Sequence, residues 1–138
     1  MPILLRCHKG VGPEVSGIAL VAAENFSARY DLDRSRGVFS RPGHKLAGES
    51  YVDRILVLDG AKGGVATAWM LHDMRARGIV PRALIFNQVN PILAQGAAFG
   101  GVALVDRFEG DVTALFRTGD MLRVDPTAGF VEILSREG

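Results

Sequence analysis

The chain has 138 residues, of which 48% are hydrophobic and 22% are charged, and its formal net charge is +1. This composition predicts a single domain over residues 1–138 with a buried core. The charge balance excludes the strong basic excess that is typical of a general nucleic-acid binder. No run of about 18 apolar residues predicts a membrane span. Because the N-terminal apolar patch is too short for a signal peptide and Cys7 is the one cysteine, a cytoplasmic protein is expected.

The first third of the chain is predicted to hold two strands and a polar loop. Ile3–His8 and Val15–Ala22 are apolar and suit strands, with Gly17 as a candidate β-bulge in the second. Ala28–Lys45 is the most polar segment, and its turn-forming residues predict an exposed loop with a short strand at 38–39. Ordered loops of this length are often functional.

A parallel β–α–β–α–β core is predicted after this loop. Arg54–Leu58 and Ala83–Phe86 are short apolar runs that suit buried strands. Val65–Arg77, between them, has helical periodicity, and its apolar face is expected to include Ala66, Trp69, Met70 and Met74. Gly78 is expected to end this helix.

The last third continues the alternation and then becomes rich in strands. Asn90 is a candidate N-cap and Pro91 a first helical residue, and Val102–Val105 is a third buried strand. One helical turn is expected over residues 111–116, and a closing hairpin over 121–124 and 130–134. The fold class is therefore layered α/β, with a parallel βαβαβ core and additional strands at both ends.

The glycine-rich turn Gly60-Ala61-Lys62-Gly63-Gly64 is a candidate anion site. Its glycines let backbone N–H groups approach a ligand, and the following helix start adds partial positive charge. Lys62 supplies a full charge for a phosphate or a carboxylate. The spacing matches neither a P-loop nor a dinucleotide fingerprint. The alternative is a tight turn whose glycines serve packing alone.

Three further residues are candidate ligand contacts. Asn87 and Asn90 follow the neighbouring parallel strand, so they are expected at the sheet edge where ligands of α/β proteins bind. Asn90 equally suits a helix cap. His44, on the polar loop, is either an acid/base or anion contact or an ordinary solvated side chain. No metal site and no complete catalytic set is predicted in this chain, and Cys7 is expected to be buried and inert.

The order of these segments resembles the small, swivelling domain of aconitase X over about residues 12–134. That resemblance implies a three-layer β/β/α swivelling domain and a role as the small subunit of a hydro-lyase. It also implies that the large partner subunit, and not this chain, carries the cysteines of an iron–sulfur cluster. The matching segments are Gly12–Ala19, Tyr30–Gly37, Arg41–His44, Leu46–Gly48, the glycine-rich turn, Ala66–Gly78, Ile79–Pro81 and Asn90–Ala97.

The resemblance further implies a dehydratase of a small hydroxy acid. Family members dehydrate cis-3-hydroxy-L-proline or phosphomevalonate, and the hydroxyproline is the first expectation for this chain. The small domain closes over the substrate, so Lys62, Gly63 and Gly64 are expected to contact its anionic group. No nucleic-acid or membrane partner is expected.

One departure from the family affects the expected chemistry. Many relatives have Arg-Gly-Ser-Ser where this chain has Lys62-Gly63-Gly64-Val65, so the serine hydroxyl that is thought to act on the substrate is missing. Three explanations stay open: a different substrate, a base from the large subunit, or a branch that has lost dehydratase activity. The alternative functions are a stand-alone module that binds a small acid and a structural subunit with a degenerate site.

Overall fold

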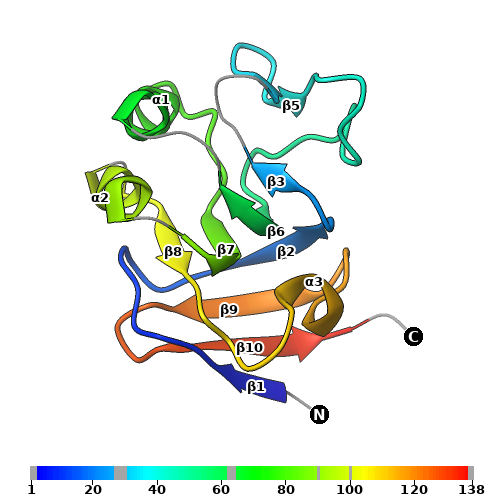
Figure 1. The fold of residues 1–138 in the computed structure, drawn as a ribbon, viewed down its shortest axis with the longest axis vertical. Helices are drawn as coiled ribbons and strands as arrows, with labels where there is room; N and C mark the ends of the chain where they lie inside the picture. The colour runs from blue at the N-terminus through cyan, green and yellow to red at the C-terminus, as the bar shows by residue number, and fades with distance from the viewer. Residues whose placement is uncertain (1–2, 27–30, 62–64, 90, 100, 137–138) are drawn as a thin grey trace.

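The computed structural model describes residues 3–26, 31–61, 65–89, 91–99 and 101–136. Strands and helices alternate in the middle of the chain, as the sequence predicts, and short strands precede and follow this part (Figure 1). Along the chain they are β1 (Ile3–Arg6), β2 (Val15–Val21), β3 (Asn25–Phe26), β4 (Leu32–Asp33), β5 (Val38–Phe39), β6 (Ile55–Ala61), α1 (Val65–Ala76), β7 (Ala83–Gln88), α2 (Pro91–Phe99), β8 (Ala103–Val105), α3 (Val112–Leu115), β9 (Met121–Asp125) and β10 (Phe130–Ser135).

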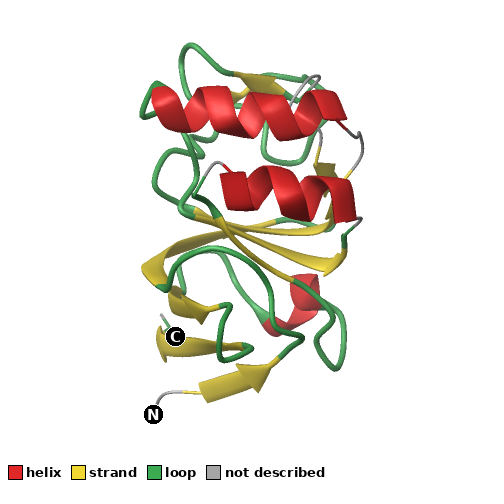
Figure 2. Cartoon of the chain, turned by 90° about the vertical axis from the view of Figure 1, so that its left-hand side faces the viewer, coloured by secondary structure: helices red, strands yellow, loops and turns green. Residues whose placement is uncertain are grey.

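The main sheet has eight strands, with the order β1-β10-β9-β2-β6-β7-β8 and with β3 beside β6. Strands β2, β6, β7 and β8 are parallel neighbours, whereas β1, β10, β9 and the first half of β2 pair antiparallel. Figure 2 shows three layers: the two long helices, the parallel strands and the antiparallel strands. The predicted fold class, with its parallel core and additional strands at both ends, is confirmed.

The two spaces between these layers hold separate cores. Alternate side chains of a strand point to opposite faces, so Leu56 of β6 packs on the helix side with Leu71 and Met74. Its neighbour Ile55 packs on the other side, with residues of the antiparallel layer such as Val124. Because β6, β7 and β8 are covered on both faces, each begins with a continuous apolar run.

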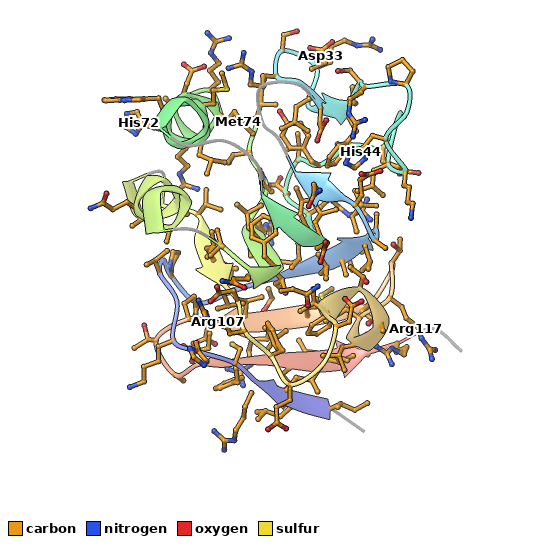
Figure 3. The ribbon with its side chains drawn as sticks, in the orientation of Figure 1. Asp33, His44, His72, Met74, Arg107 and Arg117 are labelled. Atoms are coloured by element: carbon orange, nitrogen blue, oxygen red, sulfur yellow. The ribbon has the colours of Figure 1, made fainter. Side chains whose placement is uncertain are left out.

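Two local predictions are corrected by the structure. Trp69 does not join the buried face of α1, since 68% of it is exposed, while Met74 faces the sheet and His72 lies on the opposite side (Figure 3). Gly17 is not a bulge, because its register with β9 is regular. A Cβ there would lie 3.2 Å from the Ile55 side chain, so close packing explains the glycine.

The polar segment before β6 is also less exposed than predicted. The short strand at 38–39 is confirmed and pairs with β4. However, Leu32, Phe39, Leu46 and Tyr51 are buried and join the helix-side core. These side chains occur singly among turn residues, so they give no periodic signal. The segment thus packs on the protein as an ordered loop. No helix in the described ranges is long and apolar enough to cross a membrane.

Candidate functional site

The carboxyl ends of the parallel strands meet at one edge of the sheet, as the sequence predicts. β6 and β7 run side by side to the pair Gly60↔Gln88, and β7 pairs with β8 up to Ile85↔Val105. Asp59 and Asn87 therefore lie together, and Asp106 follows the adjacent strand. Lys62, Gly63, Gly64 and Asn90 lie outside the described residues, so their ligand contacts stay predictions.

Asn87 joins three elements at this edge. Its Nδ2 donates to Asp59 Oδ1 at 2.9 Å and to Asp111 Oδ1 at 3.0 Å. Its Oδ1 accepts from the Val112 amide at 2.8 Å, and its carbonyl accepts from the Arg107 amide at 3.0 Å. The amide is thus held by the protein, and a ligand contact by Asn87 would compete with these bonds.

Asp111 is the N-cap of α3. Its carboxylate accepts from the Thr113 amide at 2.9 Å, which satisfies a free donor of the helix start. The hydrogen bond from Asn87, followed by those from Thr113, lowers the pKa of the Asp111 carboxyl below its usual value. The predicted helical turn is confirmed, and it is fixed to the sheet edge by Asn87.

His44 is buried, which contradicts the expectation of a histidine on an exposed loop. Its side chain has no exposed surface and stacks on Phe39, with the ring centroids 4.8 Å apart. Nδ1 accepts from the Leu46 amide at 3.0 Å, so the proton is on Nε2, which donates to the Asn25 carbonyl at 3.0 Å. Asp31 Oδ2 lies 3.7 Å from Nε2.

This histidine supports the strand beside the glycine-rich turn. Asn25, whose carbonyl accepts from His44, belongs to β3 and pairs with Gly60 of β6. Asp59 also donates its amide to the Glu24 carbonyl at 3.0 Å, and Lys45 Nζ donates to the Ala23 carbonyl at 3.1 Å. The loop thus fixes the end of β6, from which the predicted anion site continues, and a direct substrate contact by His44 stays untested.

Buried charge in this loop is compensated locally. Asp31 is 3% exposed and accepts from Arg41 Nε. Arg41 also lies 3.8 Å from Glu24. A buried carboxylate needs such partners, because they offset a desolvation cost of roughly several kcal/mol. Asp31 is therefore a structural residue of the loop that carries His44.

The described residues do not form a metal-ligand group. Within residues 3–26, 31–61, 65–89, 91–99 and 101–136, no three His, Cys, Asp or Glu side chains gather closely enough to hold a metal ion. Cys7 is half-buried, and burial, with the nearby Asp106 charge, raises the pKa of its thiol to about 11. A neutral thiol is a poor nucleophile and a poor ligand, which agrees with the expectation that Cys7 is inert. The expectation that Cys7 is buried is corrected, because its side chain is only partly covered.

Comparison with known proteins decides the family. The sequence profile of the aconitase X swivel domain matches residues 4–133. The chain belongs to this family. A phosphomevalonate dehydratase small subunit of Methanococcoides burtonii is 32% identical and is matched over 97% of this chain and 98% of its own. The corresponding subunit of Methanocella arvoryzae is 30% identical over 94% and 98%.

The swivel-domain fold agrees with a solved structure. The crystal structure of Thermococcus kodakaraensis aconitase X in its holo form superposes with a TM-score of 0.88 at 26% identity, over 96% of this chain and 99% of that chain. The predicted enzyme class, a small subunit of an aconitase X-type dehydratase, is confirmed at the level of the family.

Sequence reasoning missed the carboxylates that organise this edge. Asp59 directly follows the predicted strand 54–58, and Asp111 is the first residue of the predicted helical turn. Asp31 belongs to the segment that is predicted as an exposed loop, and the structure shows it buried beside His44. An aspartate before a helical turn is an N-cap signal, so the capping role of Asp111 could have been predicted from the sequence. The pairing of Asp59 with Asn87 spans 28 positions and has no local signal.

Proposed function

We propose that this chain closes over an anionic hydroxy acid as the small subunit of an aconitase X-type dehydratase, with phosphomevalonate as its first candidate substrate. The similarity to the phosphomevalonate dehydratase small subunits, over nearly the full length of each chain, supports this choice. Many relatives have a serine at the position of Gly64, and its absence here leaves a different substrate open. The second candidate is therefore cis-3-hydroxy-L-proline, which is the first expectation from the sequence.

Binding and orientation are the roles that we assign to this chain. Lys62 and the backbone N–H groups of Gly63 and Gly64 bind the phosphate or carboxylate group of the substrate. The described scaffold supports this assignment, because His44, through Asn25, and Asn87, through Asp59, hold the strand that precedes the turn. No side chain of this chain is assigned the role of proton acceptor, so the base is expected from the large subunit.

The partner that we propose is a large aconitase X subunit that holds an iron–sulfur cluster. The described side chains here do not fit such a group, since no three candidate ligands gather and Cys7 carries a pKa of about 11. When bound in the partner, the cluster supplies a Lewis acid for the leaving hydroxyl. This chain excludes water and orients the substrate's anion beside it.

Reconstitution tests the proposal. The chain is co-expressed with the large aconitase X subunit of the same organism, and the anaerobically purified complex is assayed with phosphomevalonate and with cis-3-hydroxy-L-proline. Dehydration of phosphomevalonate by the complex, and by neither subunit alone, is the expected result. If the complex dehydrates cis-3-hydroxy-L-proline and not phosphomevalonate, the hydroxyproline takes the place of phosphomevalonate as the proposed substrate. Tight binding of either acid to the isolated chain, without complex formation, would establish the stand-alone binding module instead.

A further inference from the structure

The two edges of the eight-stranded sheet approach each other at one end. Val11 and Leu104 exchange both backbone hydrogen bonds, at 3.0 and 2.9 Å. The His8 amide donates to the Asp106 carbonyl at 3.2 Å. A Cβ at Gly10 would lie 1.8 Å from the Leu104 carbonyl oxygen, so only glycine permits this approach. The segment after β1 is thus joined to β8, although the two strands are at opposite ends of the sheet order.

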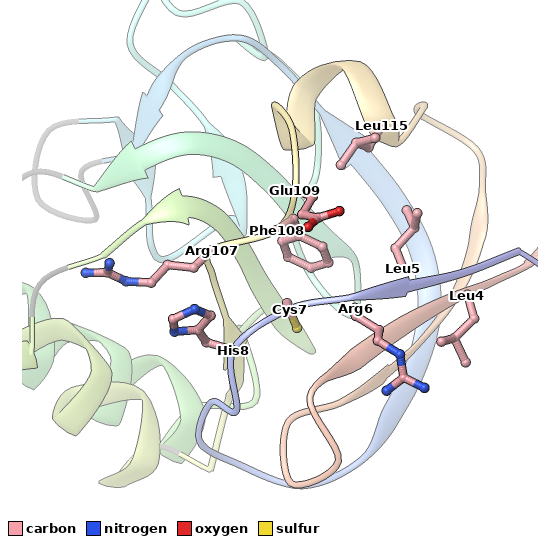
Figure 4. A pocket seen from close by; sticks show the side chains of 9 residues that line it. All are labelled: Leu4, Leu5, Arg6, Cys7, His8, Arg107, Phe108, Glu109 and Leu115. Carbon is pink, nitrogen blue, oxygen red and sulfur yellow. The ribbon is translucent and has the colours of Figure 1, made fainter.

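From His8 back toward Leu4 the two edges separate and leave a cleft of about 750 Å³, here called the seam. Figure 4 shows β1 along one side and the segment after β8, with α3, along the other. Leu5, Phe108 and Leu115 belong to the core between the two β layers and give the seam an apolar floor. The full lining is Leu4, Leu5, Arg6, Cys7, His8, Arg107, Phe108, Glu109 and Leu115.

The edge of β1 that faces the seam carries backbone amides without a strand partner among the described residues. Successive amides of an extended strand point to opposite edges. The Cys7 amide bonds to the Gly129 carbonyl on the β10 side, and the His8 amide points the other way. By this alternation the amides of Leu4 and Arg6 point to the seam. In the described part of the chain, no strand pairs with this edge of β1.

Charge and position indicate what fills the seam. Of the two arginines in the lining, Arg107 lies 3.7 Å from Asp106 and is already paired. Arg6 forms no ion pair with the described residues, and Glu109 is the one acidic side chain of the lining. Arg6 therefore favours an acidic occupant along its side of the seam. The Arg107 amide donates to the Asn87 carbonyl, so the Arg107 end of the seam lies beside the candidate site. A partner that covers that site would lie next to this end of the seam.

We propose that the seam receives an extended segment of the large subunit, with alternating apolar and acidic side chains, which adds to β1 as a strand. This inference rests on the proposed function, because the occupant is the partner proposed above. Main-chain hydrogen bonds to β1 supply affinity, and alternate side chains supply specificity. The apolar ones enter toward Leu5 and Leu115, and the acidic ones face Arg6.

Hydrogen exchange on the assembled complex tests the added strand. Exchange of the peptide that contains residues 4–8 is measured by mass spectrometry for the chain alone and in complex with the large subunit. Protection of the Leu4 and Arg6 amides by about tenfold or more is expected, since strand addition pairs them. A complex without protection there overturns the inference and leaves the proposed function intact. Failure of the wild-type chains to associate overturns both.

A charge-reversal variant tests the acidic occupant. Arg6→Glu is expected to weaken the complex by about tenfold or more, mainly through slower association and with a smaller salt dependence, because Arg6 is an exposed charge. Arg77→Glu is the matched control, because Arg77 directly follows α1, is exposed, and does not line the seam. Equal affinity of the Arg6→Glu and Arg77→Glu complexes would overturn the acidic occupant. Circular dichroism checks that both variants fold.

Discussion

Asn87 donates a hydrogen bond of 2.9 Å to Asp59, and this bond joins the ends of two neighbouring parallel strands. The same Nδ2 reaches Asp111 at 3.0 Å, so one amide separates two carboxylates. Two carboxylates that share one donor lie close enough to repel each other, and the hydrogen bonds from that donor offset the repulsion. The strand that leads into the predicted anion site is therefore held by a polar contact as well as by its apolar core.

Asn87→Asp is expected to lower the free energy of unfolding by about 1–3 kcal/mol at neutral pH. The substitution removes the donor and adds a third carboxylate. The pKa of Asp111 is lowered mainly by Asn87, so the stability that this bond contributes is present above the ordinary carboxyl pKa and is lost as the pH falls. Urea unfolding at pH 7 and at pH 4 should show a smaller deficit at the lower pH.

Gln88→Glu is the control for this variant, because Gln88 is the next residue and is exposed. It adds a negative charge near the same strand end without removing a described bond of Asn87. A deficit for Asn87→Asp that is equal at both pH values would contradict the proposed repulsion.

The sequence predicted the fold better than the site. Continuous apolar runs identify β6 and β7 because these strands are covered on both faces, and Gly78, at φ 72°, ends α1 as expected. Contacts between distant segments have no such signal. The burial of His44 depends on Asn25 and Phe39, which meet only after the loop folds back. Strand β3 consists of Asn25 and Phe26 alone, too short for a periodic pattern.

His44→Phe is expected to destabilise the protein by about 1–3 kcal/mol, because it leaves the Asn25 carbonyl and the Leu46 amide without their partner. A phenyl ring keeps the stacking on Phe39. Faster hydrogen exchange of the Leu46 amide would locate the effect in the loop. His72→Phe is the control, because His72 is exposed on α1. Unchanged unfolding and exchange in His44→Phe would contradict the positioning role.

Tyr51→Phe is expected to stabilise the protein by about 1 kcal/mol. The Tyr51 hydroxyl is buried and finds no hydrogen-bond partner among the described residues, so its removal ends a desolvation cost. Burial raises the pKa of this hydroxyl to about 12.

The same burial gives the tyrosine variant a pH signature. Since the folded state resists ionisation, the wild type loses stability as the pH rises from about 10, the ordinary tyrosine pKa, toward 12. The difference in the free energy of unfolding between Tyr51→Phe and the wild type should therefore grow between about pH 9 and about pH 10.5. Tyrosine in the unfolded chain begins to ionise over roughly this range. Thermal unfolding at both pH values measures this difference, and a constant or negative difference would contradict the buried, unpartnered hydroxyl.

Lys62→Ala tests the predicted anion contact in the reconstituted complex. A charge-assisted hydrogen bond to a phosphate contributes about 1.5–3 kcal/mol, so KM should rise by roughly 10- to 100-fold while kcat changes little, because binding is lost equally in the ground and transition states. Lys9→Ala is the matched control: Lys9 is exposed in the segment between β1 and β2, outside the candidate site, and its kinetic constants should stay near those of the wild type. Unchanged KM in Lys62→Ala would favour the structural subunit with a degenerate site, and a lost kcat at unchanged KM would place Lys62 in the chemical step.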